Sequence, residues 1–194
     1  EPDDVLPGAR DRVRDIRGEQ ARRGRAEHAE ERVHEDLHGL RGHRIAVALR
    51  LRALLADLGL VTFPMLTGGK GIHVIAPLDA SVTWPKVKDF AERFSRAIAE
   101  AEPDVFTANI RKNQRKGRIF LDWLRNQRGA TAVMPYSARA REGAPVAAPI
   151  AWEELDKVKG GNLYSIRDAD ELLERASSKL LAGWGEAKQK LPKA

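Results

Sequence analysis

The chain has 194 residues, of which 42% are hydrophobic and 32% are charged, a balance that suits one folded domain and excludes a wholly disordered chain. It has no cysteine and no apolar run near 18 residues, which excludes disulfides, cysteine-based zinc sites and a membrane-spanning helix, and we expect no signal peptide. The net charge of +6 makes nucleic acid a candidate partner, although many basic proteins are merely soluble.

The amino-acid composition changes sharply near residue 45. Residues 1–44 contain ten Arg, eleven Asp plus Glu and four of the five His, but no Lys and no aromatic residue. Their apolar stripe is thin, so we interpret 1–44 as a poorly specified polar segment with a tenuous helix at 25–41. Residues 45–194 form the second predicted region, and they carry the basic excess, with 24 Lys plus Arg against 17 Asp plus Glu.

The first part of this second region predicts a helix and a hairpin. Apolar spacing favours a helix over 45–58, which Gly59 closes at the position after its cap. Short apolar runs at 60–66 and 72–77 predict two strands that pair around the glycine-rich turn 67–71.

The remaining elements alternate between helix and strand. Thr83 followed by Pro85 predicts the start of a helix that runs to about Ala101 and ends before Pro103. Further along we expect a strand at 119–124, a short strand or turn at 131–134, a loop at 135–149, and helices at 152–158 and 169–181. This alternation predicts an α/β or α+β domain.

The glycine-rich turn is the first candidate site. Glycines allow close approach of a ligand, and successive backbone N–H groups in such a turn can hold an anion. The hydroxyl of Thr67, the ammonium of Lys70 and the imidazole of His73 would suit a triphosphate. A plain hairpin turn with a surface lysine is the alternative, and the pattern is not a Walker A loop, since no Ser/Thr follows Gly-Lys.

Asp122 is the second candidate, because a carboxylate inside an apolar strand is disfavoured without a partner. That partner could be a divalent metal ion or a neighbouring arginine in a salt bridge. Arg125 could hold a phosphate with two hydrogen bonds. One carboxylate does not make a two-metal site, which needs several acidic ligands.

A third candidate is a basic stretch with interleaved aromatic residues. Arginine on phosphate and rings under bases are typical of single-strand binding, whereas a solvated loop is the alternative. The stretch comprises Trp123, Arg125, Arg128, Tyr136, Arg139 and Arg141.

These segments together resemble one family, the polymerase domain of bacterial DNA ligase D. The resemblance rests on GGKGIHV followed by PL, and on RKGRIFLDWLRNQRGATAVMPYSARAREGAPVAAPI followed by a Trp-Glu-Glu-Leu helix. It extends from about Ala46 to Leu181 and implies the C-terminal half of a primase-polymerase fold, an incomplete version with a mixed or antiparallel sheet flanked by helices.

The resemblance also implies an activity. Members of the family extend a DNA 3′ end with nucleotides during non-homologous end joining, using two Mn²⁺ or Mg²⁺ ions. The expected partners are DNA ends, nucleoside triphosphates, and possible Ku and DNA ligase modules, in the bacterial cytoplasm. Ligation by this chain alone is not expected.

The family's functional residues map onto named positions here. By resemblance, Asp122 is the catalytic metal-binding aspartate, and its carboxylate and the imidazole of His73 converge on one pocket. The residues implied to bind the triphosphate are Thr67 (where the family usually has Ser), Lys70, His73, Arg115, Arg125 and Arg139.

One family motif has no counterpart in this chain. The family has an apolar strand ending in Asp-x-Asp-Pro before the glycine turn, which supplies two of three metal carboxylates. The corresponding region here reads Glu30-Glu31-Arg32-Val33-His34-Glu35-Asp36. We therefore expect impaired catalysis, and the alternatives are a non-catalytic remnant that binds nucleotide or DNA, or a truncated, non-functional product with an open sheet edge.

The unusual composition of residues 1–44 leads to a testable hypothesis, namely that they are translated out of frame from a GC-rich gene. We then expect an alternative frame upstream of codon 46 to encode an apolar strand ending in Asp-x-Asp-Pro. Sequencing the coding DNA checks this, and the absence of that motif from both alternative frames would refute it.

Overall fold

The computed structural model describes residues 42–192, so the tenuous helix predicted at 25–41 lies outside the described residues. The described chain falls into two compact units. Residues 42–79 and 132–192 form what we call the sheet unit, and residues 80–131 form the α4 unit. Between residues 42 and 192 there is no helix with the length and apolarity needed to cross a bilayer. The division of the chain at residue 44 into two regions stays a prediction.

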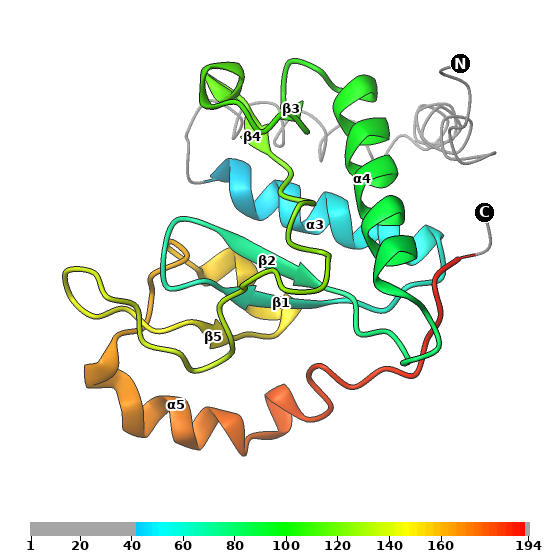
Figure 1. Ribbon diagram of the computed structural model, residues 1–194. Coiled ribbons are helices and arrows are strands. Elements are labelled where there is room, and N and C mark those ends of the chain that lie inside the picture. Colours follow the sequence, from blue (N-terminus) through cyan, green and yellow to red (C-terminus); the bar gives the residue numbers. More distant parts are fainter. Residues whose placement is uncertain (1–41, 193–194) are drawn as a thin grey trace, which may run out of the picture. The chain divides into compact units, whose positions relative to one another are not determined.

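The sheet unit is built on a three-stranded antiparallel sheet with the strand order β2-β1-β5 (Figure 1). Met65 lies opposite His73, and Leu66 lies opposite both Ile72 and Ala148. The elements of this unit are α3 (Gly42–Asp57), β1 (Phe63–Leu66), β2 (Ile72–Ile75), β5 (Ala148–Pro149), η2 (Trp152–Lys157), η3 (Ile166–Asp168), α5 (Ala169–Ala176) and η4 (Lys179–Leu181).

Helix α3 ends as the sequence predicts. Gly59 has φ of 78°, a conformation that favours glycine. Its N–H donates to the carbonyl of Ala56 at 2.8 Å, and the N–H of Leu60 donates to the carbonyl of Leu55 at 2.9 Å. These two bonds form a Schellman motif, which satisfies carbonyls that the helix end would otherwise leave unpaired.

The largest buried cluster of the sheet unit lies on one face of β1, and Met65 on the other face is also buried. Side chains alternate along a strand, so Leu66 and its partners Ile72 and Ala148 share a face, while Met65 and His73 share the opposite face. The first face packs on residues from α3, η2 and α5. This buried cluster comprises Ala48, Leu66, Val146, Ala148, Ile150, Leu155, Val158, Tyr164 and Leu172.

The α4 unit consists of one long helix and a two-stranded parallel ladder. Helix α4 (Trp84–Ala101) begins after Thr83, has a proline in its first turn, and buries Phe90 and Ile98. The elements that follow are β3 (Phe106–Thr107), η1 (Lys112–Arg115) and β4 (Ile119–Phe120), with β3 and β4 paired in parallel.

Several predicted elements differ from the structure. The strand expected at 119–124 ends at Phe120, because its partner β3 offers only two residues for pairing. No strand forms at 131–134, and the end of the expected loop 135–149 pairs with β1 as β5. The helix expected at 152–158 is a 3₁₀ helix, and the one expected at 169–181 is split into α5 and η4. The mixed class of helices and sheet is nevertheless confirmed.

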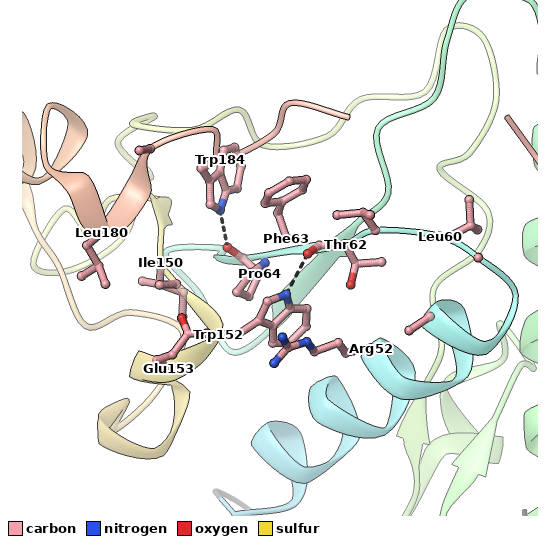
Figure 2. Close-up of a pocket in the computed structure, with 15 residues that line it drawn as sticks. Arg52, Leu60, Thr62, Phe63, Pro64, Ile150, Trp152, Glu153, Leu180 and Trp184 are labelled. Carbon is pink, nitrogen blue, oxygen red and sulfur yellow. Dashed lines mark hydrogen bonds between the residues drawn. The ribbon is translucent and has the colours of Figure 1, made fainter. Parts of the chain in front are cut away.

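A pocket of about 570 Å³ lies beside the start of β1 (Figure 2). The indole N–H of Trp152 donates to the carbonyl of Thr62 at 2.7 Å, and that of Trp184 donates to the carbonyl of Pro64 at 3.0 Å. The guanidinium of Arg52 lies 4.9 Å from the centre of the Trp152 ring. These contacts connect η2 to the residue just before β1, and the segment after η4 to β1 itself.

An ion pair joins η2 to α5. Arg175 lies 2.8 Å from the carboxylate of Glu154, and the two side chains are only 15% and 19% exposed. The same carboxylate accepts the N–H of Ala151 at 2.7 Å. Burial is the largest single influence on the Glu154 pKa and raises it. The hydrogen bonds from Arg175 and Ala151 and the positive charges of Arg175 and Lys157 together outweigh burial and leave the pKa below its ordinary value of 4.5.

We predict that Glu154→Gln destabilises the protein at neutral pH by roughly 1.5–3 kcal/mol, the range expected for a hydrogen bond to a charged group. A lowered carboxyl pKa contributes stability above the unfolded value, and that contribution disappears as pH falls through the folded value. The variant should therefore lose less stability than the wild type between about pH 5 and pH 3. Denaturant unfolding measured across this pH range checks both effects.

Glu153→Gln provides the matched control, because Glu153 is the exposed neighbour on the same 3₁₀ helix. It should leave the pH profile unchanged. Equal acid sensitivity in wild type and Glu154→Gln would contradict the prediction.

Candidate nucleotide-binding site

The turn between β1 and β2 is closed by its own hydrogen bonds. Both the N–H and the hydroxyl of Thr67 donate to the carbonyl of Gly71, at 3.3 Å and 2.9 Å. Among residues 42–192, no acceptor pairs with the backbone N–H groups of Gly69 and Lys70, and the Lys70 side chain is exposed. The turn therefore offers two backbone donors and an ammonium group to an anion.

Two arginines flank this turn. Nη1 of Arg139 donates to the carbonyl of Thr67 at 3.3 Å. A Cβ atom on Gly68, whose φ is 64°, would lie 2.8 Å from Cγ of Arg139, and one on Gly69 would lie 3.3 Å from Nη1 of Arg141. Arg139 can approach this closely only because position 68 is glycine, and glycine at position 69 leaves room for Arg141.

The backbone around Arg139 fixes its place beside the turn. Its N–H donates to the carbonyl of Pro145 at 2.8 Å, and Ala138 bridges to Val146, next to β5. Because β5 pairs with β1, an arginine 72 residues away in sequence is held against Thr67.

His73 lies on β2 near the end of the turn. It is half-buried and opposite Met65, on the sheet face that does not carry Leu66 and Ile72. His73 is therefore not part of the cluster around Leu66, although its cross-strand partner Met65 is buried. Among the predicted nucleotide-binding residues, Thr67, Lys70, His73 and Arg139 all belong to the sheet unit, and direct contact is seen between Arg139 and Thr67.

The remaining predicted residues lie in the α4 unit and contact one another or their neighbours. The expectation that Asp122 lies inside a strand is wrong, because β4 ends two residues earlier and the carboxylate is 42% exposed. Asp122 pairs with Nε of Arg125 at 3.3 Å, which is the salt-bridge alternative raised from the sequence. Arg125 also donates to the carbonyl of Thr131 at 2.6 Å.

Arg115 is engaged within the same unit. Its guanidinium lies 3.7 Å from the centre of the Phe120 ring, and it donates to the carbonyl of Ile110. The convergence of Asp122, in the α4 unit, with His73, in the sheet unit, stays a prediction.

The described residues do not form a complete metal site. Within residues 42–192, no group of three or more His, Cys, Asp or Glu side chains could hold a metal ion. Asp122 could supply one carboxylate, but its ion pair with Arg125 occupies one of its oxygens. A two-metal centre needs more acidic ligands than this part of the chain provides.

Sequence reasoning left out one segment that touches the turn. Gly160 and Gly161 lie between η2 and η3, and Gly161 is buried against the backbone of Gly69 and Gly71. The pair of adjacent glycines was an available signal, since such a pair permits close approach of two backbones. The pocket beside β1 contains none of the predicted site residues.

Comparison with known proteins bears directly on this site. The model of the LigD primase-polymerase domain matches residues 39–180, a match that begins seven residues before the resemblance noted from Ala46. The multifunctional non-homologous end joining protein LigD of Pseudomonas aeruginosa is 45% identical over 121 residues, which is 62% of this chain and 14% of that protein. The LigD end-joining repair protein of Mycobacterium tuberculosis is 43% identical over 110 residues, which is 57% of this chain and 14% of that protein.

A solved structure shows the same similarity to LigD. The polymerase domain of Mycobacterium tuberculosis Ligase D in complex with DNA aligns with a TM-score of 0.62 and 37% identity, over 74% of this chain and 48% of that chain. The chain thus spans about half of that domain and about one seventh of the two full-length relatives. Because the family match covers most of its length, the chain belongs to the LigD primase-polymerase domain family.

Proposed function

We propose that this chain is the C-terminal part of an end-joining polymerase domain of the bacterial cytoplasm, and that it binds a nucleoside triphosphate and a DNA end. The observation that carries the proposal is the glycine turn flanked by Arg139, where the amides of Gly69 and Lys70 have no acceptor within residues 42–192 and Arg139 donates to the carbonyl of Thr67. The DNA part is supported by the structural relative, which is described in complex with DNA.

In the proposed site, the turn residues and Arg139 hold the phosphates. The amides of Gly69 and Lys70 and the guanidinium of Arg139 would donate to phosphate oxygens, and Lys70 would add charge. The Thr67 hydroxyl already donates to Gly71, so its main contribution is to close the turn, and contact with a phosphate requires it to exchange that bond. His73 would act as a further donor.

For residues of the α4 unit we propose the roles that the family resemblance implies. Arg125 and Arg115 would bind phosphate, and Asp122 would provide one carboxylate to a metal ion. Both roles require the ion pair between Arg125 and Asp122 to open first. In this reaction class, Mn²⁺ or Mg²⁺ would activate the attacking 3′-hydroxyl and stabilise the leaving pyrophosphate. Ku and a separate ligase module remain proposed partners.

A second candidate function is binding without catalysis. It is favoured by the pairing of Asp122 with Arg125 and by the absence of a three-ligand metal cluster among residues 42–192. We propose that catalysis by this chain is strongly impaired, because Asp122 is the only one of the family's metal carboxylates that the motifs identify.

Primer extension distinguishes the two functions. With Mn²⁺, a template-primer end and ribonucleotides, we expect extension at background, with no further loss in Asp122→Ala. Salt-sensitive DNA binding that survives in Asp122→Ala would support the binding function. Robust extension that Asp122→Ala abolishes would overturn the impairment.

The nucleotide site has its own test. We predict that Arg139→Ala weakens ATP binding by about tenfold or more, the effect of losing a hydrogen bond between a cation and a phosphate. Isothermal titration calorimetry measures the affinity, and thermal unfolding shows whether the variant remains folded. Arg167→Ala removes an exposed arginine of the same unit as a control. Equal affinity in Arg139→Ala and wild type would exclude Arg139 from the site.

A further inference from the structure

We infer that Gly161 is a positioning residue that holds the Thr67–Gly71 turn in its anion-binding shape. This inference rests on the proposed nucleotide site. Gly161 does not contact a ligand in the proposal, and it acts through the backbone of the turn.

The contact between Gly161 and the turn is unusually close. A Cβ atom at position 161 would lie 2.4 Å from the carbonyl oxygen of Gly71, 2.8 Å from that of Gly69 and 3.2 Å from the Gly71 nitrogen. Real Cβ atoms essentially never approach another atom closer than 3.0 Å. All three neighbours are backbone atoms, so no side-chain rotation can relieve the overlap and one of the two backbones has to move.

The segment that carries Gly161 is anchored on both sides. Val158 and Tyr164 are buried in the core cluster. The N–H of Val146 donates to the carbonyl of Tyr164 at 2.8 Å, and Pro145 bridges to Ser165. Displacing this segment would disturb the core, so the tip of the turn, where Lys70 and Gly71 are exposed, is the part expected to yield.

Movement of the turn would change the proposed site directly. The Gly71 carbonyl that faces Gly161 is the acceptor for both the N–H and the hydroxyl of Thr67. If this carbonyl is pushed away, the bonds that close the turn are lost and the amides of Gly69 and Lys70 change direction. A side chain at position 161 would therefore reduce nucleotide binding without contacting the nucleotide.

The adjacent glycine supplies a matched control. A Cβ atom on Gly160 would meet the Asn162 side-chain oxygen at 3.1 Å and no backbone atom of the turn. The Asn162 side chain is exposed and can rotate. Gly161→Ala and Gly160→Ala thus add the same methyl group at neighbouring positions. Only the methyl group at position 161 overlaps the backbone of the turn.

The experiment compares both variants with the 194-residue wild type, using ATP with Mg²⁺ in calorimetry. We expect Gly161→Ala to melt cooperatively and to bind ATP about tenfold or more weakly, as a misplaced binding group does. Gly160→Ala should bind like the wild type. Unchanged affinity in Gly161→Ala, or an equal loss in Gly160→Ala, would overturn the inference.

Two further measurements separate this inference from the proposed function. If the wild type fails to bind ATP, the nucleotide site is wrong, and amide NMR shifts still test the contact. Gly161→Ala should then shift the amide signals of residues 68–71, while Gly160→Ala should not.

If Gly161→Ala fails to fold, hydrogen exchange of the wild type tests the inference instead. ATP should protect both 67–71 and 159–162, and protection of 67–71 alone would contradict the inference.

Discussion

Backbone packed against backbone around the Thr67–Gly71 turn is the constraint on which the candidate site depends. Gly68 admits the stem of Arg139, and Gly161 lies against the carbonyls of Gly69 and Gly71. Each approach is possible only where a Cβ atom is absent. The turn is therefore held from two sides by segments distant in sequence. Its shape is set by packing, and the intrinsic preference of five residues for a turn is only part of the cause.

The same packing depends on how residues 132–192 are fastened to β1. Trp152 donates to the carbonyl of Thr62 just before that strand, Trp184 donates to Pro64 within it, and β5 pairs with its end. The side chain of Gln189 bonds to both the N–H and the carbonyl of Val61 at 2.8 Å. The Glu154–Arg175 pair adds a charged link between η2 and α5. Arg139 thus reaches the turn on a segment that is anchored along the whole length of β1.

The α4 unit presents a different chemical situation. Asp122 is exposed and forms an ion pair with Arg125, an interaction that contributes little to stability at such exposure. Arg125 and Arg115 are both engaged by carbonyls and by a carboxylate or an aromatic ring. Binding of a phosphate by either arginine has to compete with these contacts. This competition gives a physical reason to separate the nucleotide binding proposed for the turn from catalysis.

The sequence by itself determined the local features of this protein. Gly59 ended α3 through its left-handed backbone, Pro85 marked the start of α4, and the glycine turn between two apolar runs predicted the β1–β2 hairpin. The motifs around Gly71 and Asp122 also identified the family, because long ordered matches carry more information than periodicity. These features depend on interactions between residues close together in the chain.

Only the tertiary structure decided which distant segments meet. The strands β3 and β5 have two residues each, too few for any periodic pattern, and they exist because partners across the sheet supply their hydrogen bonds. The bond between Arg139 and Thr67, the approach of Gly161 to Gly71 and the end of β4 before Asp122 likewise follow from such pairings. Contacts across many residues depend on the packing of the whole unit, and local sequence preference does not encode that packing.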